Sequence, residues 1–286
     1  MTEIEEKVLF DGFDDHRFAD EGGLVFPDKP EQRAGRFEFL RDEDRVGNGI
    51  LRLSVQTPKS GPQSNLCKRA EVWERYGAMT SYQTGTWYGI SVRFCSDYPK
   101  DSERYMIAQW KREIVSQDLT RLSPFLALRL RRGKLFVTAE THFRDEGARF
   151  LGAGGTPSKM WVRPQWGQMR ALLATDDRWT DDDDIDFSEL RPDILIESYG
   201  RSLPNPDSGW IDFIVFVRPD PRGRGCILLY ANGNLIVKAT GCIGYEGEGL
   251  GPKKYFKFGP YCDVQAADWA LEFDNFRRGP TFESVS

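Results

Sequence analysis

The sequence lacks several features that would place it in a common functional class. No apolar run approaches the roughly 20 residues that a membrane-spanning helix needs. There is no basic excess either, because 39 Lys and Arg residues stand against 44 Asp and Glu residues, for a net charge of −5. General nucleic-acid and membrane-surface partners favour basic proteins, so we expect neither partner here. Any cationic site must therefore be local.

Cysteine and histidine are also scarce. The five cysteines are odd in number and show no tight C-x-x-C spacing, which favours reduced thiols and argues against a zinc site. Histidine occurs only at His16 and His142. The first seven residues are acidic and polar, unlike a signal peptide. We therefore expect a cytoplasmic protein, or a secreted or periplasmic one whose leader has been removed.

What the sequence does have is a series of short strand signals separated by polar turns. They cover residues 50–55, 86–94, 105–111, 125–131, 134–141, 210–217, 226–230, 235–239, 255–261 and 269–276. Arg132-Gly133 and Asn232-Gly233 are predicted to be hairpin turns. With 40% hydrophobic residues, the 286-residue chain can bury a sizeable core. We predict one all-β domain over residues 1–286, a concanavalin-like β-sandwich (jelly roll).

One stretch, from about residue 144 to residue 208, interrupts this pattern. It is rich in Gly, Pro and Asp, and we interpret it as a large loop insertion, with a candidate helix over residues 186–199. Asp181 to Asp184, together with Asp186, could hold Ca²⁺, which binds several carboxylate oxygens. The spacing of an EF-hand is absent, so a solvated acidic loop is the commoner interpretation of these residues.

Alternation along three predicted strands separates a core face from a polar face. The strand over residues 255–261 directs its Phe residues to one face and Tyr255, Lys257, Gly259 and Tyr261 to the other, where the glycine leaves room for something to approach. In the same way, Tyr105, Gln109 and Lys111 share a face opposite Met106, Ala108 and Trp110, and Arg69 and Glu71 share a face opposite Ala70 and Val72. Such faces are usually solvated, but three of them rich in tyrosines and cations favour a binding surface.

These three segments also carry motifs in a characteristic order. Arg69-Ala70-Glu71-Val72 precedes Gln109-Trp110-Lys111, and Tyr255-Phe256-Lys257-Phe258-Gly259-Pro260-Tyr261 follows. This order resembles the signature strands of jelly-roll polysaccharide lyases, in which alginate lyases carry R-[ST]-E-L, Q-I-H and Y-F-K-A-G-x-Y. Other segments look more similar to the heparin lyase I and glucuronan lyase groups. The resemblance extends from about residue 8 to residue 279, apart from the insertion.

The resemblance implies a function and assigns roles to residues. It implies β-elimination in an acidic, uronate-containing polysaccharide bound on the concave face of the sandwich, without an obligatory cofactor. Arg69 and Gln109 would neutralise the uronate carboxylate, and Glu71 would orient Arg69. Tyr255 and Lys257 would line the groove, and Tyr261 would be the acid/base. The chemistry agrees, because removal of the C5 proton builds negative charge that nearby cations and donors stabilise.

The chain departs from the family pattern at one position. Lys111 stands where the family usually has His, and a lysine of ordinary pKa, about 10.4, is a poor base near neutrality. It can still neutralise the carboxylate, with Arg129 as a further cation. His142 shares the parity of Phe136, Thr138 and Glu140 and could reach the groove, although an ordinary strand-end histidine is the simpler interpretation. The departure leaves a syn elimination by tyrosine alone.

Two other functions remain open from the sequence. A non-catalytic, lectin-like protein on the same fold would keep the binding surface without turnover. A glycosidase would need two facing carboxylates, but Glu71 and Glu74 differ in strand parity and are predicted to point apart. No phosphate-binding loop, nucleophile elbow or zinc motif is present.

Overall fold

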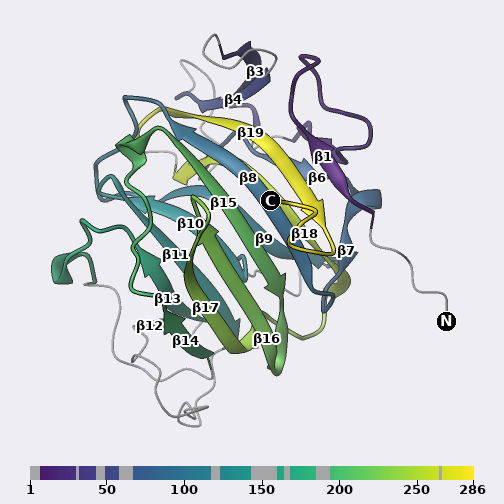
Figure 1. Cartoon of the computed structure of the whole chain (residues 1–286), viewed down its shortest axis with the longest axis vertical. Coiled ribbons are helices and arrows are strands. Elements are labelled where there is room, and N and C mark those ends of the chain that lie inside the picture. Colours follow the sequence, from purple (N-terminus) through teal and green to yellow (C-terminus); the bar gives the residue numbers. More distant parts are fainter. Residues whose placement is uncertain are drawn as a thin grey trace.

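The computed structural model describes residues 7–29, 32–42, 49–57, 67–116, 123–142, 160–163, 168–184, 194–263 and 266–286. Within these residues, two antiparallel sheets stack as the layers of a sandwich (Figure 1). The predicted all-β sandwich is confirmed. None of the described helices has the length and apolar character that crossing a membrane requires. None of the five cysteines forms a disulfide.

The first layer is a nine-stranded sheet in the described part of the chain. Its strands follow the order β14-β17-β16-β15-β8-β19-β4-β3, and β1 pairs with β19. In sequence order these strands are β1 (Leu9–Asp11), β3 (Gly35–Arg41), β4 (Gly49–Val55), β8 (Thr86–Phe94), β14 (Ile194–Ser198), β15 (Trp210–Arg218), β16 (Asp220–Ala231), β17 (Asn234–Ile243) and β19 (Trp269–Gly279).

The second layer is a ten-stranded sheet in the order β12-β13-β11-β10-β9-β18-β6-β2, with β5 and β7 also paired to β18. Its strands are β2 (Leu24–Val25), β5 (Cys67–Arg69), β6 (Val72–Glu74), β7 (Thr80–Ser81), β9 (Tyr105–Ile114), β10 (Leu126–Arg131), β11 (Lys134–His142), β12 (Met160–Arg163), β13 (Gln168–Thr175) and β18 (Leu250–Asp263). Three short 3₁₀ turns complete the described elements: η2 (Tyr76–Ala78), η4 (Asp181–Asp184) and η5 (Pro206–Ser208).

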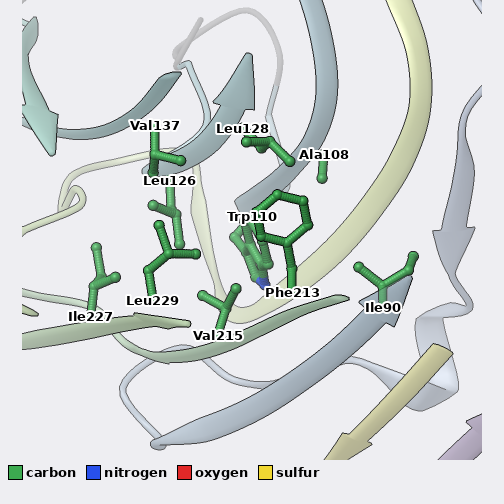
Figure 2. Close-up of a pocket in the computed structure, with 10 residues that line it drawn as sticks. All are labelled: Ile90, Ala108, Trp110, Leu126, Leu128, Val137, Phe213, Val215, Ile227 and Leu229. Carbon is green, nitrogen blue, oxygen red and sulfur yellow. The ribbon is translucent and has the colours of Figure 1, made fainter. Parts of the chain in front are cut away.

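The core lies between the two sheets and follows the predicted alternation. Phe256, Phe258, Trp110 and Val72 are all buried there, and the rings of Trp110 and Phe256 lie 4.6 Å apart. Figure 2 shows a small pocket in this interior, where Ile90, Phe213 and Val215 of the nine-stranded sheet face Ala108, Trp110 and Leu128 of the ten-stranded sheet. Because its lining is apolar, this pocket offers no groups that would bind a charged sugar.

Both predicted hairpin turns are confirmed. Arg132-Gly133 joins β10 to β11 and Asn232-Gly233 joins β16 to β17. All four residues have positive φ, between 48° and 72°, as the two central positions of a type I′ turn require. The turn residues therefore set the register next to each turn, and the β16–β17 pair shifts register between Leu229 and Tyr230.

The stretch interpreted as an insertion contributes to both sheets. Its strands β12 and β13 extend the ten-stranded sheet, and β14 pairs with β17 at the edge of the nine-stranded sheet. The candidate helix over residues 186–199 is wrong for its last part, because residues 194–198 form a strand, while residues 185–193 lie outside the described residues. Ile194 and Ile196 of β14 are buried in the core, so burial of an alternating strand outweighs the local acidic residues that suggested a helix cap.

A register shift in β9 corrects one predicted face. Ala108 lies opposite Phe258 and Leu128, whereas Met106 lies opposite Tyr261 and Arg129, with register shifts between these positions on both sides. The bulge reverses the alternation that the sequence predicted for Tyr105. Tyr105 is buried against Trp269, with ring centres 5.4 Å apart, and does not share the face of Gln109 and Lys111.

Candidate active site

The predicted site residues meet on the face of the ten-stranded sheet that is turned away from the nine-stranded sheet, which we call the outer face. Lys257 of β18 lies directly opposite Gln109 of β9, and Tyr255 lies opposite Lys111. Tyr261 of β18 pairs with Arg69 of β5. Phe256 and Trp110 point inwards to the core. Because side chains alternate along each strand, the residues next to them on β18 and β9 point outwards.

Glu71 is the centre of this arrangement. Its carboxylate is fully buried and lies 2.9 Å from Nε of Arg69 and 3.3 Å from Nζ of Lys257. The side-chain amide of Gln109 donates to its other oxygen. The predicted role of Glu71 in orienting Arg69 agrees with this geometry, and the same carboxylate also holds Gln109 and Lys257. A single buried anion thus fixes three donors from three segments.

The backbone of Glu71 is held by a residue that sequence reasoning missed. Ala70 and Glu71 lie in the break between β5 and β6, where ladder hydrogen bonds are interrupted. The Gln32 amide replaces them, because its Nε2 donates to the Glu71 carbonyl at 2.8 Å and its Oε1 accepts from the Glu71 N–H at 3.0 Å. Gln32 comes from a loop without a periodic pattern, so the sequence contained no signal for it.

Gly259 has a structural role that differs from the predicted one. Its φ is +124°, and a Cβ placed on it would lie 2.0 Å from the backbone oxygen of Ala70. The space that the glycine leaves is therefore taken by the connection between β5 and β6. This close approach brings Arg69 and Glu71 against β18, because any larger residue would push that connection away.

Lys257 lies beneath the outer face, away from water. Only 2% of the residue is exposed, and its ammonium lies 4.3 Å from the centre of the Trp73 ring. Burial lowers the pKa of Lys257 well below its ordinary value; Glu71 opposes this shift, and nearby Arg69 and Lys111 add to it. The lysine therefore anchors the Glu71 cluster from below, and the half-buried Lys111 is the more accessible of the two ammonium groups.

Tyr261 lies between cations. The guanidinium carbon of Arg69 is 4.5 Å from the centre of its ring, and Nη2 of Arg104 lies 3.4 Å from its hydroxyl oxygen. Burial raises the pKa of Tyr261 above its ordinary value of about 10, and Arg104 is the strongest of the groups that oppose this rise. Tyr261 is half-buried on the outer face, as predicted, so its hydroxyl is placed where a bound sugar could reach it.

Arg129 belongs to a second charged cluster on the same face. Its Nε donates to Thr138 at 2.9 Å and its Nη2 to Glu140 at 3.0 Å. Glu140 also accepts from Arg170 at 2.7 Å and from the Tyr245 hydroxyl at 2.9 Å. Arg129 is almost completely buried, which lowers the pKa of its guanidinium. Its charge is thus directed at Glu140 and not at the Glu71 cluster.

His142 lies at the far side of this second cluster. Its ring packs edge-on against Tyr245, with ring centres 5.5 Å apart, and its Nε2 accepts the backbone N–H of Glu246 at 2.8 Å. In a neutral imidazole one nitrogen accepts and the other carries the proton. Since the accepting nitrogen is engaged by Glu246, the arrangement gives His142 no lone pair for proton abstraction.

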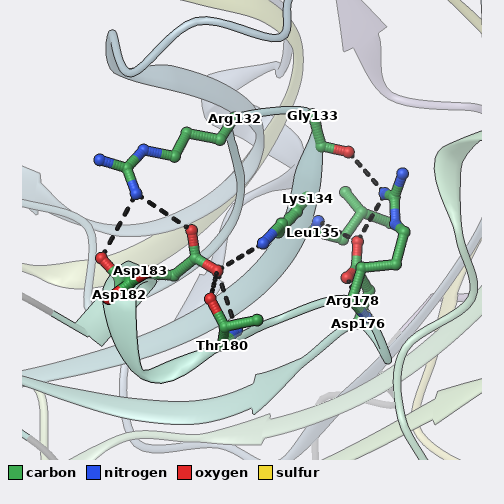
Figure 3. Close-up of polar contacts among 9 residues, drawn as sticks. All are labelled: Arg132, Gly133, Lys134, Leu135, Asp176, Arg178, Thr180, Asp182 and Asp183. Carbon is green, nitrogen blue, oxygen red and sulfur yellow. Dashed lines mark hydrogen bonds and ion pairs between the residues drawn. The ribbon is translucent and has the colours of Figure 1, made fainter.

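The acidic run at η4 is held by basic partners (Figure 3). Asp183 is buried, and its carboxylate accepts from Lys134 at 2.6 Å and from the Thr180 hydroxyl at 3.0 Å. Arg132 lies 3.5 Å away. These contacts lower the pKa of Asp183, although burial alone would raise it. No group of His, Cys, Asp or Glu residues suited to a metal ion occurs among the residues that the structure describes, and Asp186 lies outside them.

The carboxylates do not form the facing pair of a glycosidase. Glu71 points to the outer face, whereas Glu74 is buried between the sheets, 2.7 Å from Arg278 of β19. Its second oxygen accepts the N–H of Phe256 at 2.6 Å. The predicted opposite orientation of Glu71 and Glu74 is therefore confirmed.

The comparisons with known proteins bear on the fold and on the family of the chain. A crystal structure of an endo-β-1,4-glucuronan lyase from the fungus Trichoderma reesei matches with a TM-score of 0.57 at 12% identity, covering 89% of this chain and 91% of that one. The alginate lyase vAL-1 from Chlorella virus matches with a TM-score of 0.45 at 11% identity, covering 85% and 88%. No curated protein sequence matches significantly. The sequence profile of the polysaccharide lyase family, however, matches residues 11–277. The chain belongs to the polysaccharide lyase family.

Proposed function

We propose that the chain cleaves a uronate-containing polysaccharide by β-elimination on the outer face of the ten-stranded sheet. The observation that carries the proposal is the position of Tyr261 beside the Arg69–Glu71–Gln109–Lys257 cluster. This position supports the proposal, because a phenol that can transfer a proton lies next to cations and an amide. Such a combination suits a substrate that carries a carboxylate beside an acidic C–H bond.

In the proposed reaction, Tyr261 in its ionised form takes the C5 proton of the uronate. The electron pair of the broken C5–H bond moves onto the adjacent carboxylate, where Arg69 and Lys111 stabilise it. Gln109 is only 2% exposed and supports this arrangement through its hydrogen bond to Glu71. The electron pair then forms the C4–C5 double bond as the C4–O bond breaks. The departing oxygen takes the proton back from Tyr261, so one phenol serves as base and then as acid. No water or external oxidant is consumed.

Each member of the cluster has a distinct role in this proposal. Glu71 holds Arg69 and Gln109 in place and does not contact the sugar, because it is fully buried. Lys111 takes the place of the histidine of related lyases and meets the carboxylate as a cation. Tyr255, which lies near Trp73 with ring centres 6.0 Å apart, offers an aromatic surface to a neighbouring sugar. The Arg129–Glu140 cluster supports the sheet beside the site.

The second candidate is a lectin-like protein on the same fold. Lys111 favours this candidate, because it stands where related lyases have a histidine. A protein that binds uronates through Arg69 and Lys111 but cannot ionise Tyr261 would bind without cleaving. In this case Tyr261 would serve only as a ring against which a sugar packs. The two candidates share a substrate class and differ only in turnover.

The test is a lyase screen over glucuronan, alginate, heparin and other uronate polymers. A lyase generates an unsaturated uronate that absorbs in the ultraviolet, whereas a glycosidase raises reducing ends without that chromophore. Tyr261→Phe is the matched control, because it keeps the ring and removes the hydroxyl. We expect absorbance from the parent protein on at least one polymer, a 10²–10⁴-fold lower rate for Tyr261→Phe and nearly unchanged binding. Binding without any absorbance would favour the lectin-like protein, and full activity of Tyr261→Phe would contradict the assignment.

A further inference from the structure

Arg104 contacts Tyr261 from outside the three sequence motifs and is itself paired with Asp263. Arg104 immediately precedes β9, and its Nη2 lies 3.4 Å from the Tyr261 hydroxyl oxygen. The same nitrogen donates to a carboxylate oxygen of Asp263, the last residue of β18. The guanidinium carbon of Arg104 is 5.2 Å from the centre of the Tyr261 ring. Three side chains at one end of the outer face are thus linked through Nη2 of Arg104.

The phenol needs such a contact because its surroundings oppose ionisation. Burial disfavours the phenolate, and the neighbouring Cys67 and Glu71 disfavour it further, since each carries negative charge when ionised. Two cations favour the phenolate by lowering the pKa of Tyr261, Arg104 more strongly than Arg69. A base that takes a proton from carbon must spend part of its time ionised, so the balance among these groups sets the rate.

The two arginines are placed differently with respect to Tyr261. Arg69 lies over the ring, 4.5 Å from its centre, and its Nε is engaged by Glu71 at 2.9 Å. Arg104 is directed at the oxygen that gains the charge. Asp263 in turn fixes Arg104, in the way that a third group commonly orients the partner of a reacting side chain.

We propose that Arg104 stabilises the ionised hydroxyl of Tyr261 during proton abstraction and that Asp263 holds Arg104 in that position. The inference rests on the proposed function of Tyr261 as the acid/base. Arg104 moves no proton itself and is a positioning residue. Its charge also remains next to the phenol when the proton is returned to the leaving oxygen, which favours return of the enzyme to the ionised state.

The experiment measures ionisation of Tyr261 without substrate. Tyr261 is replaced by 3-fluorotyrosine, and the ¹⁹F chemical shift is followed against pH in the parent protein and in Arg104→Gln, Arg104→Lys and Asp263→Asn. Arg222→Gln is the matched control, because Arg222 forms an exposed ion pair with Glu246 at 2.9 Å. We expect Arg104→Gln to raise the midpoint by about one pH unit, the effect of losing one adjacent cation. Arg104→Lys and Asp263→Asn should raise it by less, and Arg222→Gln should not change it.

Activity provides the second measurement. On a polymer that the parent protein cleaves, Arg104→Gln should lower kcat by up to about tenfold at neutral pH with little change in KM, and Arg104→Lys should recover part of the loss. An unshifted midpoint in Arg104→Gln would overturn the inference even if the protein is an active lyase. A lowered midpoint in Asp263→Asn would overturn the role of Asp263. If the midpoint shifts but the protein cleaves no uronate, the missing cleavage counts against the proposed function alone. The titration still tests the inference, because it needs no substrate.

Discussion

The carboxylate of Glu71 lies 3.3 Å from the ammonium of Lys257, and both side chains are almost completely buried. Replacing Glu71 by Gln would leave Lys257 and Arg69 without their shared anion in a region that excludes water. Removing one partner of a buried ion pair typically costs about 3–5 kcal/mol. We expect Glu71→Gln to lower the free energy of unfolding by about this amount, measured by denaturant titration.

The matched control for Glu71 is Glu197→Gln on the nine-stranded sheet. Glu197 pairs with Lys238 at 3.0 Å, but both side chains are more than a third exposed. Such surface pairs contribute about 0–1 kcal/mol. Equal losses of stability in the two variants would contradict the role of Glu71 as the anchor of the cluster.

The raised pKa of Tyr261 predicts how activity depends on pH. The ionised phenol is the base, so its population increases as pH rises, and a raised pKa moves the midpoint above the ordinary value of about 10. We expect kcat/KM to rise from neutral into alkaline pH, by up to about tenfold per pH unit, over the range in which circular dichroism shows the protein to be folded. A plateau reached near pH 6–7 would point to a histidine base instead.

Lys111 is expected to act through its charge. Lys111→Ala should raise KM and lower kcat together, because the substrate carboxylate loses a partner in the ground state and in the transition state. Lys111→His restores the residue of related lyases and should extend activity to lower pH, since an imidazole accepts protons near neutrality. Steady-state kinetics of both variants, with Lys238→Ala as a surface control, tests this. Unchanged kinetics in Lys111→Ala would exclude contact with the carboxylate.

The number of proton-transfer groups predicts which uronates are cleaved. Tyr255 and Tyr261 lie on the outer face beside the Glu71 cluster, Tyr105 is buried against Trp269, and His142 accepts from the backbone of Glu246. With Tyr261 as base and acid, the C5–H and C4–O bonds must lie on the same side of the sugar ring. We expect cleavage of polymers of D-glucuronate or D-mannuronate and none of L-guluronate or D-galacturonate, measured by ultraviolet absorbance. Cleavage of polyguluronate would indicate a second base, with Lys111 as the first candidate.

Strand alternation explains which part of the site could be predicted from the sequence. Lys257, Gln109 and Tyr261 lie on strands whose opposite face is buried, so alternation predicts the direction of their side chains. Tyr105 was misplaced because a bulge reverses the alternation within β9, and no residue type marks that bulge. Gln32 and Arg104 were missed because both lie outside the strands, where position depends on long-range contacts.

Long-range contacts also explain why residues 144–208 contribute strands to both sheets. Strand β12 pairs with β13, β13 pairs with β11, and β14 pairs with β17. The pairs β11–β13 and β14–β17 join residues that are more than 25 positions apart in the sequence. The local composition, rich in Gly, Pro and Asp, favours loops and hides these strands. The segments that carry the resemblance to lyases lie on strands outside this region, and these strands pair with one another around β18.

The pairing of β18 with β5, β6, β7 and β9 has a consequence for biosynthesis. Arg69, Glu71 and Gln109 leave the ribosome long before Lys257 and Tyr261, and until β18 emerges these earlier side chains have no strand to join them. Glu71 would then be a solvated carboxylate on an unpaired segment. The nascent chain therefore acquires the proposed site only after β18 has emerged, which limits exposure of a reactive surface during synthesis.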